Sequence, residues 1–475
     1  MNDIIKLLNL KDNNINIINI EVEGNNKIVT LEIPLKEHFC PTCDFKMYSK
    51  GIKKRIVKHP VLQDGYNVLL KLNQRSWTCS NPECKLFISD EFPFIHKYKR
   101  STNMTDMMII EAFRNINTTS SDIARRFHVS DTHVLNIFDR YVDMKRLTFS
   151  EIICIDEVYL NYDYDSKYAM IIQDFKTGQP IDIIQSRRKQ YTREYFSSIP
   201  VKERYSVKFL ICDMYKPYMN FVKIYFPNAT IVVDSFHVIQ WINNKLNNYM
   251  RSLLAKFRKR DNEKKEKMEL GKSTNISLPT SDEVYMLSKH KWIVLSSQEN
   301  INYSSNPKWD SHFRFYIDVY KYESILFDID KSLLHLRNLK YLYENFNNTN
   351  IGDPENALLE LDKLIKIYKK SGYDIFIQFA NLLKTYRIPI SNSFITVEKN
   401  GKNGPYLSRL SNGPIESLNR KPKDLKRNSR GIRNFRHARN RILFAERDAM
   451  EILGTPKSLK EIKNKSGKKR GKYKK

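Results

Sequence analysis

The chain has 475 residues, 41% of them hydrophobic, which is enough for two to four domains with cores of their own. Its 81 Lys and Arg residues outnumber 53 Asp and Glu residues, and the formal charge of +28 favours nucleic acid over a membrane surface as the partner. No apolar run reaches the roughly 18 residues that span a bilayer, and the N-terminus lacks the layout of a cleavable signal, so we expect a cytoplasmic protein with no membrane association.

Four of the six cysteines form two close pairs, Cys40 with Cys43 and Cys79 with Cys84. In an intracellular chain such pairs indicate structural Zn²⁺ more than disulfides, because tetrahedral coordination needs two turns that each present two thiolates to one ion. The second pair is more widely spaced than in a standard zinc ribbon, so free thiols are the alternative.

After the second cysteine pair the hydrophobic pattern becomes helical. Ser120 or Ser121 can cap a first short helix, and Asp131 can cap a second. This spacing is typical of a helix-turn-helix, whose second helix presents its early residues to the DNA major groove. The groove-facing candidates are Thr132, His133 and Asn136. A small helical hairpin without a DNA-binding role is the alternative.

Three strand-like runs then carry an aspartate near their ends. They are EIICIDEVYL with Asp156, SVKFLICDMY with Asp213, and NATIVVDSFH with Asp234. Two further strand-like runs and a helix lie between the first two, and this is the strand order of a ribonuclease-H-like core. That core places the first and fourth strands side by side, so Asp156 and Asp213 would meet at adjacent strand ends and could share a divalent metal. A surface position for these carboxylates is the alternative.

The chain from about 261 to 395 is mainly helical, and Asp353 with Pro354 marks the start of one helix. We interpret this stretch as an insertion into the core, with an ordinary helical subdomain as the alternative. A later helix has Asn412 as its cap and Glu416 in its first turn, where an acidic residue can also simply compensate the helix dipole. Pro422 is expected to kink or end that helix.

The motifs described so far follow one another in a fixed order: CPTC, the second cysteine pair, the two short helices, IDE, ICDMY, VVDSFHV, the helical stretch and NGPIESLNRKPKDLKRNSRGIRNF. This order resembles that of the insertion-sequence transposases of the ISL3 family. The resemblance extends from about Cys40 to Phe444. It implies a DDE catalytic triad that binds two Mg²⁺ or Mn²⁺ ions, formed by Asp156, Asp213 and Glu416. Asp234 and His237 match a further motif, and a structural role for them is as open as a catalytic one.

The resemblance also implies a bacterial protein that forms a homo-oligomer on double-stranded DNA. It would cleave the terminal inverted repeats of its element and transfer the strand to target DNA. Basic residues of the Glu416 helix would contact this DNA, among them Lys423, Lys426 and Arg427. Two other functions remain open: a DNA-binding regulator derived from a transposase, and a ribonuclease-H-like nuclease that cuts without joining.

The expected fold class is therefore α/β, with a ribonuclease-H-like core and a helical insertion, preceded by a zinc-binding module and a helix-turn-helix. The final nineteen residues hold ten Lys or Arg, and this tail would add sequence-independent DNA affinity or only solubility. The expected parts are an N-terminal segment (1–35), the zinc-binding module (36–98), the helix-turn-helix (99–148), the first part of the core (149–260), the insertion (261–395), the last part of the core with the Glu416 helix (396–452) and the basic tail (453–475).

Overall fold

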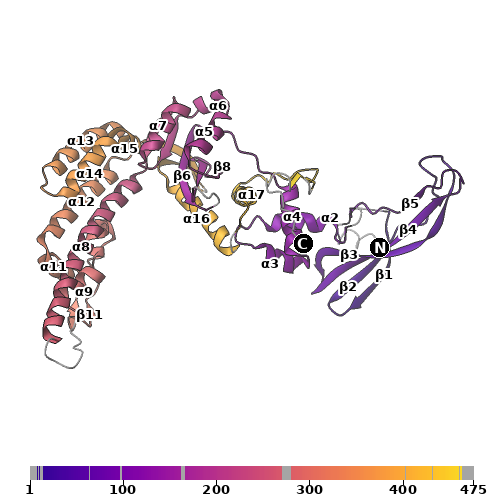
Figure 1. The fold of residues 1–475 in the computed structure, drawn as a ribbon, viewed down its shortest axis with the longest axis horizontal. Coiled ribbons are helices and arrows are strands. Elements are labelled where there is room, and N and C mark those ends of the chain that lie inside the picture. The colour runs from indigo at the N-terminus through magenta and orange to yellow at the C-terminus, as the bar shows by residue number, and fades with distance from the viewer. Residues whose placement is uncertain are drawn as a thin grey trace, which may run out of the picture. The chain divides into compact units, whose positions relative to one another are not determined.

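The computed structural model describes residues 8, 10, 14–63, 65–96, 99–161, 166–269, 280–401, 403–429, 432–458 and 461–462. Most of the expected basic tail lies outside these residues. The chain divides into two compact units, and Figure 1 shows their elements. The N-terminal unit combines residues 1–145 with 424–475, and the central unit consists of residues 146–423.

A five-stranded sheet forms the first part of the N-terminal unit. Its strand order is β1-β2-β4-β3, with β5 paired to β4; β2 and β4 run parallel and the other pairs antiparallel. Val68, Leu70 and Leu72 alternate along β4 and are buried, as expected for a strand with one face on a core. The strands are β1 (Asn16–Glu23), β2 (Asn26–Glu32), β3 (Met47–Gln63), β4 (Tyr66–Cys79) and β5 (Phe87–Ser89). The segment 1–35, expected to stand apart, thus contributes two strands to the sheet of the cysteine module.

Helices α2 (Asn103–Ala112), α3 (Ser120–Phe127) and α4 (Asp131–Tyr141) follow the sheet. Both caps lie before the residues that the sequence suggested, at Thr119 in place of Ser120 or Ser121 and at Ser130 in place of Asp131. Thr119 caps α3, because its hydroxyl accepts from the Asp122 N–H while the Asp122 carboxylate accepts from the Thr119 N–H, which satisfies two backbone donors at once. Ser130 caps α4 by accepting from the N–H of His133.

The C-terminal helix α17 (Phe435–Glu446) packs within the N-terminal unit, although we expected it in the catalytic core. Its buried Arg441 donates to the carbonyl oxygens of Phe113 at 2.6 Å and Thr118 at 3.1 Å. Nδ1 of His437 lies 2.6 Å from a carboxylate oxygen of Asp139 on α4. The last part of the chain therefore completes the core around the short helices.

A second five-stranded sheet forms the centre of the other unit, in the order β10-β9-β6-β7-β8. β6, β7 and β8 pair antiparallel, whereas β9 runs parallel to both β6 and β10. The predicted neighbourhood of the first and fourth strands is therefore confirmed. The strands are β6 (Ile152–Tyr159), β7 (Tyr168–Asp174), β8 (Pro180–Ile184), β9 (Phe209–Cys212) and β10 (Thr230–Val233), and the helices beside them are α5 (Lys189–Ser197), α6 (Val201–Tyr205) and α7 (Lys216–Tyr225).

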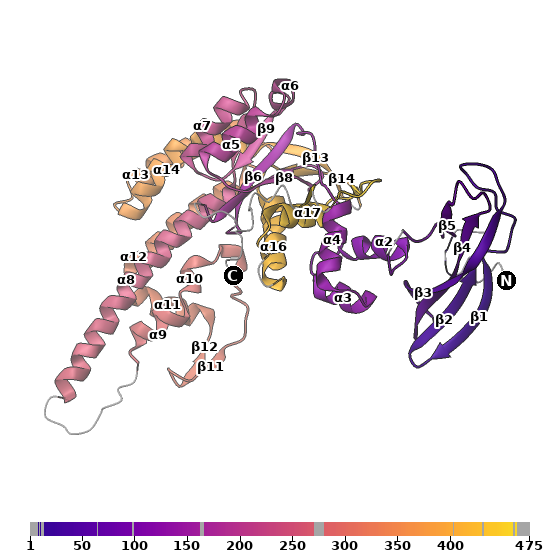
Figure 2. The same cartoon turned by 45° about the vertical axis from the view of Figure 1, so that its right-hand side comes forward.

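The long helix α8 (Ser235–Glu269) leaves this sheet after β10 and enters a helical region (Figure 2). As predicted, Asp353 caps α13 and Pro354 is the first residue of that helix. The region also holds a hairpin, β11 (Lys308–Asp310) with β12 (Phe315–Ile317), which the sequence did not indicate. Its other elements are α9 (Asp282–Lys289), α10 (Trp292–Leu295), the 3₁₀ turn η1 (Gln298–Asn300), α11 (Val319–Ile329), α12 (Lys331–Thr349), α13 (Pro354–Lys369), α14 (Asp374–Thr385) and α15 (Arg387–Asn392). Among the described residues, no helix combines the length and apolarity needed to cross a bilayer.

The chain returns to the sheet through a hairpin of β13 (Thr396–Gly401) and β14 (Gly404–Arg409), followed by α16 (Gly413–Asn428). The expectation that the helix could end at Pro422 is wrong, because α16 continues through it to Asn428. Pro422 is buried on the same helix face as Ile415, Leu418 and Leu425. Burial of its ring on this apolar face offsets part of the roughly 3 kcal/mol that a proline costs inside a helix.

Candidate functional site

Asp156 and Asp213 reach the same edge of the central sheet. Cys154 of β6 pairs with Ile211 of β9, so each aspartate lies two residues beyond a paired position. Asp156 lies inside β6 and not at its end, because pairing with β7 continues to Tyr159. Burial and the nearby charge of Asp213 raise the pKa of Asp156 to about 7. The structure therefore brings two carboxylates together at a cost in electrostatic energy.

The Asp156 carboxylate is held by one neighbour on each oxygen. One oxygen accepts from the N–H of Glu157 at 2.7 Å, and the other accepts from the side-chain amide of Asn419 on α16. Sequence reasoning missed Asn419, although it lies three residues after Glu416 and so on the same face of the helix. That spacing was the available signal.

Glu416 lies in the first turn of α16, where its N–H donates to the carbonyl of Asn412 at 3.0 Å. His237, in the first turn of α8, lies between two of the predicted carboxylates. Its Nε2 is 2.7 Å from Oδ1 of Asp213 and 3.7 Å from Oε1 of Glu416. Burial opposes a charge on the imidazole, but the close contact with the charged Asp213 outweighs it and raises the pKa of His237 to about 9.

Asp234 directly follows β10 and is only 2% exposed. Its Oδ2 makes no hydrogen bond with any residue that the structure describes. The ligand atoms of Asp234, His237 and Glu416 all lie within 4.8 Å of one another, with Asp213 in contact with the same imidazole. This group of three thus contains Asp234 and His237, which the sequence left open as structural or catalytic, together with Glu416 of the predicted triad.

The donor chemistry of this edge fits a divalent cation. Asp156, Asp213, Glu416 and Asp234 supply carboxylate oxygens, which are the ligands that Mg²⁺ and Mn²⁺ prefer. Burial raises the pKa of Asp234 and of Glu416, and a buried carboxylate oxygen without a partner is unfavourable unless a cation or a donor satisfies it. A bound cation would offset both penalties.

The four paired cysteines lie together at one end of the N-terminal sheet, and their sulfurs all lie within 4.8 Å of one another. Sγ of Cys43 is 3.4 Å from that of Cys79, and Sγ of Cys40 is 3.7 Å from that of Cys84. Four thiolates around one Zn²⁺ at the usual distance of about 2.3 Å lie about 3.8 Å apart. These separations are too long for disulfides and close to those of a tetrahedral metal site.

The predicted DNA-binding residues differ in exposure. Thr132 is exposed, whereas His133 and Asn136 are half-buried. Thr132 and Asn136 line a cavity of about 500 Å³ whose other wall includes Arg433 and His437. On α16, the predicted Lys423 and Arg427 are exposed, and Arg427 pairs with Asp424 at 2.9 Å. The third predicted basic residue, Lys426, is half-buried, and burial lowers its pKa.

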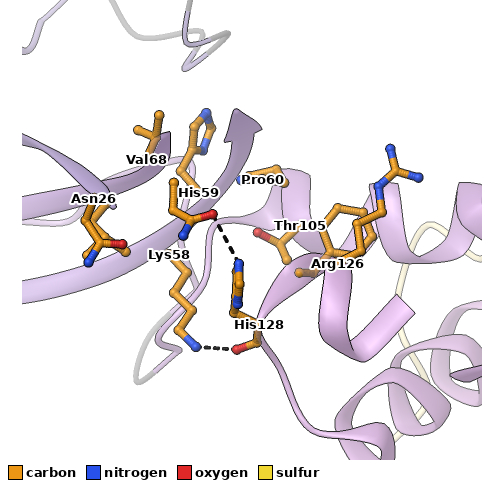
Figure 3. Close-up of a pocket in the computed structure, with 11 residues that line it drawn as sticks. Asn26, Lys58, His59, Pro60, Val68, Thr105, Arg126 and His128 are labelled. Carbon is orange, nitrogen blue, oxygen red and sulfur yellow. Dashed lines mark hydrogen bonds between the residues drawn. The ribbon is translucent and has the colours of Figure 1, made fainter. Parts of the chain in front are cut away.

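The sheet and the short helices of the N-terminal unit meet around His128, as Figure 3 shows. His128 ends α3 in a left-handed conformation with φ 52°. Its carbonyl accepts from Nζ of Lys58 on β3, and its Nε2 lies 3.1 Å from the side-chain oxygen of Asn67 on β4. Lys58, Asn67 and Arg126 line a cavity of about 280 Å³ at this junction. The sheet thus positions the turn between α3 and α4.

A known protein family matches the sequence of most of the central unit. The sequence model of a family described as transposases, the ISL3 type of DDE transposase, matches residues 153–442, which include Asp156, Asp213 and Glu416. No curated protein matches the chain. The matched region covers more than half of the sequence, and the chain therefore belongs to the ISL3 family of DDE transposases.

Proposed function

We propose that this transposase binds the terminal inverted repeats of its insertion sequence and performs metal-dependent DNA cleavage and strand transfer, with Asp156, Asp213 and Glu416 as its triad. The observation that carries the proposal is the register of β6 and β9, which aligns the two aspartates at one sheet edge. α16 adds Glu416 through its first turn and Asn419 through its contact with Asp156. The strand order supports a ribonuclease-H-like core.

The three carboxylates would hold two Mg²⁺ or Mn²⁺ ions, which supply activation of the attacking oxygen and stabilisation of the leaving oxygen. Asn419 and the Glu157 N–H fix the orientation of the Asp156 carboxylate. Asn412, whose amide lies 3.4 Å from Asp213, would do the same for the second aspartate. Water would be the first nucleophile and the freed 3′-hydroxyl the second.

The N-terminal unit would recognise the DNA. We propose that α3 and α4 form a helix-turn-helix whose Thr132, His133 and Asn136 read the repeat, while Lys423, Lys426 and Arg427 of α16 contact phosphates. The cysteine cluster would hold a structural Zn²⁺. The formal charge of +28 supports a double-stranded DNA partner, on which the protein would assemble as a homo-oligomer.

The decisive experiment follows cutting and joining of labelled duplexes that carry the inverted repeats flanking the gene, with Mg²⁺ or with EDTA. Asp156→Asn, Asp213→Asn and Glu416→Gln preserve shape but remove charge, and each should reduce cutting roughly a hundredfold or more while duplex binding persists. Glu151→Gln is the matched control, because Glu151 is an exposed carboxylate beside β6 that pairs only with Lys208 in the described ion pairs.

Two other outcomes would contradict the proposal. Specific binding of the repeats without cutting, under both Mg²⁺ and Mn²⁺, would make the protein a regulator. Cutting without joining, with a preference for hybrid or branched substrates over the repeats, would make it a nuclease of the ribonuclease H type.

A further inference from the structure

The β11–β12 hairpin carries an unusual concentration of exposed aromatic side chains. Trp309 is 58% exposed, Phe315 41% and Tyr316 68%, and the neighbouring Tyr320 of α11 is 62% exposed. Figure 2 shows the hairpin beside α9 and α11 in the helical insertion. Exposed aromatic rings gathered on one short element mark an interaction surface more often than chance exposure.

The hairpin holds these rings in a fixed arrangement. Trp309 and Tyr316 pair across the two strands, with ring centroids 5.4 Å apart and planes at 70°. On the opposite face, Asp310 and Ile317 are buried, and their cross-strand partners Phe315 and Lys308 lie on that same face. Trp309 and Tyr316 alone therefore form the outer face of the two strands. Because side chains alternate between the two faces of a strand, anchoring one face presents the other to solvent.

Asp310 is the anchor of the hairpin. Its carboxylate accepts from the hydroxyls of Tyr285 on α9 at 2.7 Å and Tyr322 on α11 at 2.6 Å. It also accepts from the backbone N–H groups of His312 and Phe313. Two of these hydrogen bonds tie the hairpin to two helices and the other two close its own turn, so its aromatic face is preorganised and would bind a partner at a low entropic cost.

The hairpin and the first turn of α11 carry three exposed cations, and one exposed carboxylate, Asp282 of α9, lies 2.8 Å from Nε2 of His312 in the hairpin turn. Lys308 and Arg314 of the hairpin and Lys321 of α11 are all exposed. Arg314 also has a φ of 59°, a left-handed conformation that costs a residue other than glycine roughly 1 to 2 kcal/mol. Arg314 closes the turn, because its N–H donates to the carbonyl of Asp310 at 2.8 Å, and it leaves the guanidinium exposed beside β12.

A cross-strand aromatic pair can also serve only to stabilise a two-stranded hairpin. That role accounts for the pairing of Trp309 with Tyr316, but not for Tyr320, which lies outside the hairpin, nor for the three cations. A second copy of the chain fits poorly, since a symmetric contact would bring Lys308 and Arg314 close to their own copies. Aromatic faces combined with cations are the usual platform for unpaired nucleic-acid bases.

We infer that the hairpin 308–317, with Tyr320, is a stacking site for unpaired bases of single-stranded DNA. The inference rests on the proposed function only for the source of that DNA, which would be the strand freed when a duplex is cut. Base stacking on Trp309 and Tyr316 would supply most of the affinity, and Lys308 and Arg314 would attract the phosphates.

The test measures binding of a fluorescein-labelled oligothymidylate to the full chain in a buffer without Mg²⁺ or Mn²⁺, by anisotropy. Trp309→Ala and Tyr316→Ala should each weaken binding roughly five- to a hundredfold, whereas Trp309→Phe should stay near wild type. The matched control is Tyr406→Ala, which removes a 51% exposed ring from the other exposed hairpin of the same unit, β13–β14. Thermal melting checks that each variant is folded.

Intrinsic fluorescence gives an independent readout, since Trp309 is the most exposed of the four tryptophans. Oligothymidylate should quench the tryptophan emission of the wild type, and Trp309→Phe should abolish that quenching while it still binds.

Unchanged binding by the Trp309→Ala, Tyr316→Ala double variant would overturn the inference. So would a double variant that loses only self-association by light scattering, because the hairpin would then be a protein interface. Neither result depends on cutting, since the buffer lacks the Mg²⁺ or Mn²⁺ that cutting would need, so a failure of the transposase mechanism would leave this test intact.

Discussion

His59 is a histidine that the fold keeps neutral. It is 6% exposed near the end of β3, where Nδ1 lies 3.1 Å from the hydroxyl of Thr102 and Nε2 lies 2.9 Å from the carbonyl of Leu8. Burial lowers its pKa from 6.5 to about 4, against a smaller opposing effect of the Leu8 carbonyl. The folded protein therefore binds fewer protons than the unfolded chain between these two pH values.

Stability from His59 is fully present above pH 6.5 and is lost as the pH falls towards 4. We expect the wild type to lose roughly 2 kcal/mol more than His59→Gln between pH 7 and pH 5, because glutamine keeps a polar side chain there but does not titrate. Urea unfolding at both pH values measures the difference. Equal losses in the two proteins would show that His59 does not control the acid sensitivity.

At this same scale, sequence reasoning found the acidic residues of the candidate site but not the amides that orient them. Asp156 and Asp213 stand out because a carboxylate at the end of an apolar run is conspicuous. Asn412 and Asn419 do not, since asparagine in a helix cap or on a helix face is ordinary. Their contacts with the two aspartates arise only when α16 packs against the sheet edge.

At the scale of elements, the cysteine turns depend on a very small core. The buried apolar cluster around them consists of Cys40, Met47, Trp77 and Cys79, flanked by a few half-buried side chains. Such a core cannot hold two turns in place alone, so a metal would supply much of their stability.

Zinc removal should therefore loosen this end of the sheet. We expect one Zn²⁺ per chain by elemental analysis, and its removal by a strong chelator should lower the melting temperature, with recovery when Zn²⁺ is returned. Cys84→Ser should lose the ion, whereas Cys154→Ala, at a buried cysteine of the central sheet, should retain it. Full zinc content in Cys84→Ser would rule out the four-cysteine site.

Elements with a local signature were predicted and elements decided by distant packing were not. The apolar runs of β6 and β9 predicted that both are strands, and the order of the elements predicted that these two strands are neighbours. Asp353 with Pro354 marked the start of α13. The continuation of α16 through Pro422 was not predictable, because it depends on which face the helix buries. The β11–β12 hairpin was missed since its strands are only three residues long.

At the scale of the whole molecule, the N-terminal unit is discontinuous in sequence. α17 buries Ile442, Leu443 and Phe444 within it, beside Arg441. Three large apolar side chains contribute roughly 5 kcal/mol or more, which is comparable to the whole stability of a small domain. No local sequence pattern indicates this packing between distant parts of the chain. The sequence therefore suggested that the residues of α17 belong to the core, with a boundary at 452.

Fragments test this dependence. Residues 1–145 alone should melt broadly or aggregate, because Phe113, after α2, and the face of α4 that contacts α17 through Phe138 would be exposed. The same fragment joined to 424–475 by a flexible glycine-serine linker should melt cooperatively, as followed by circular dichroism. Equally cooperative melting of both fragments would contradict an essential role for α17.

The split of this unit also sets an order of events during translation. A ribosome completes residues 1–145 long before 424–458, because the 278 residues of 146–423 come between them. At about 5 to 20 residues per second, the unfinished unit would wait roughly 15 to 55 s for α17. A chain terminated early would carry all of α3 and α4 but not the helix that supports them, so prematurely ended copies would compete poorly for any DNA that the proposed helix-turn-helix recognises.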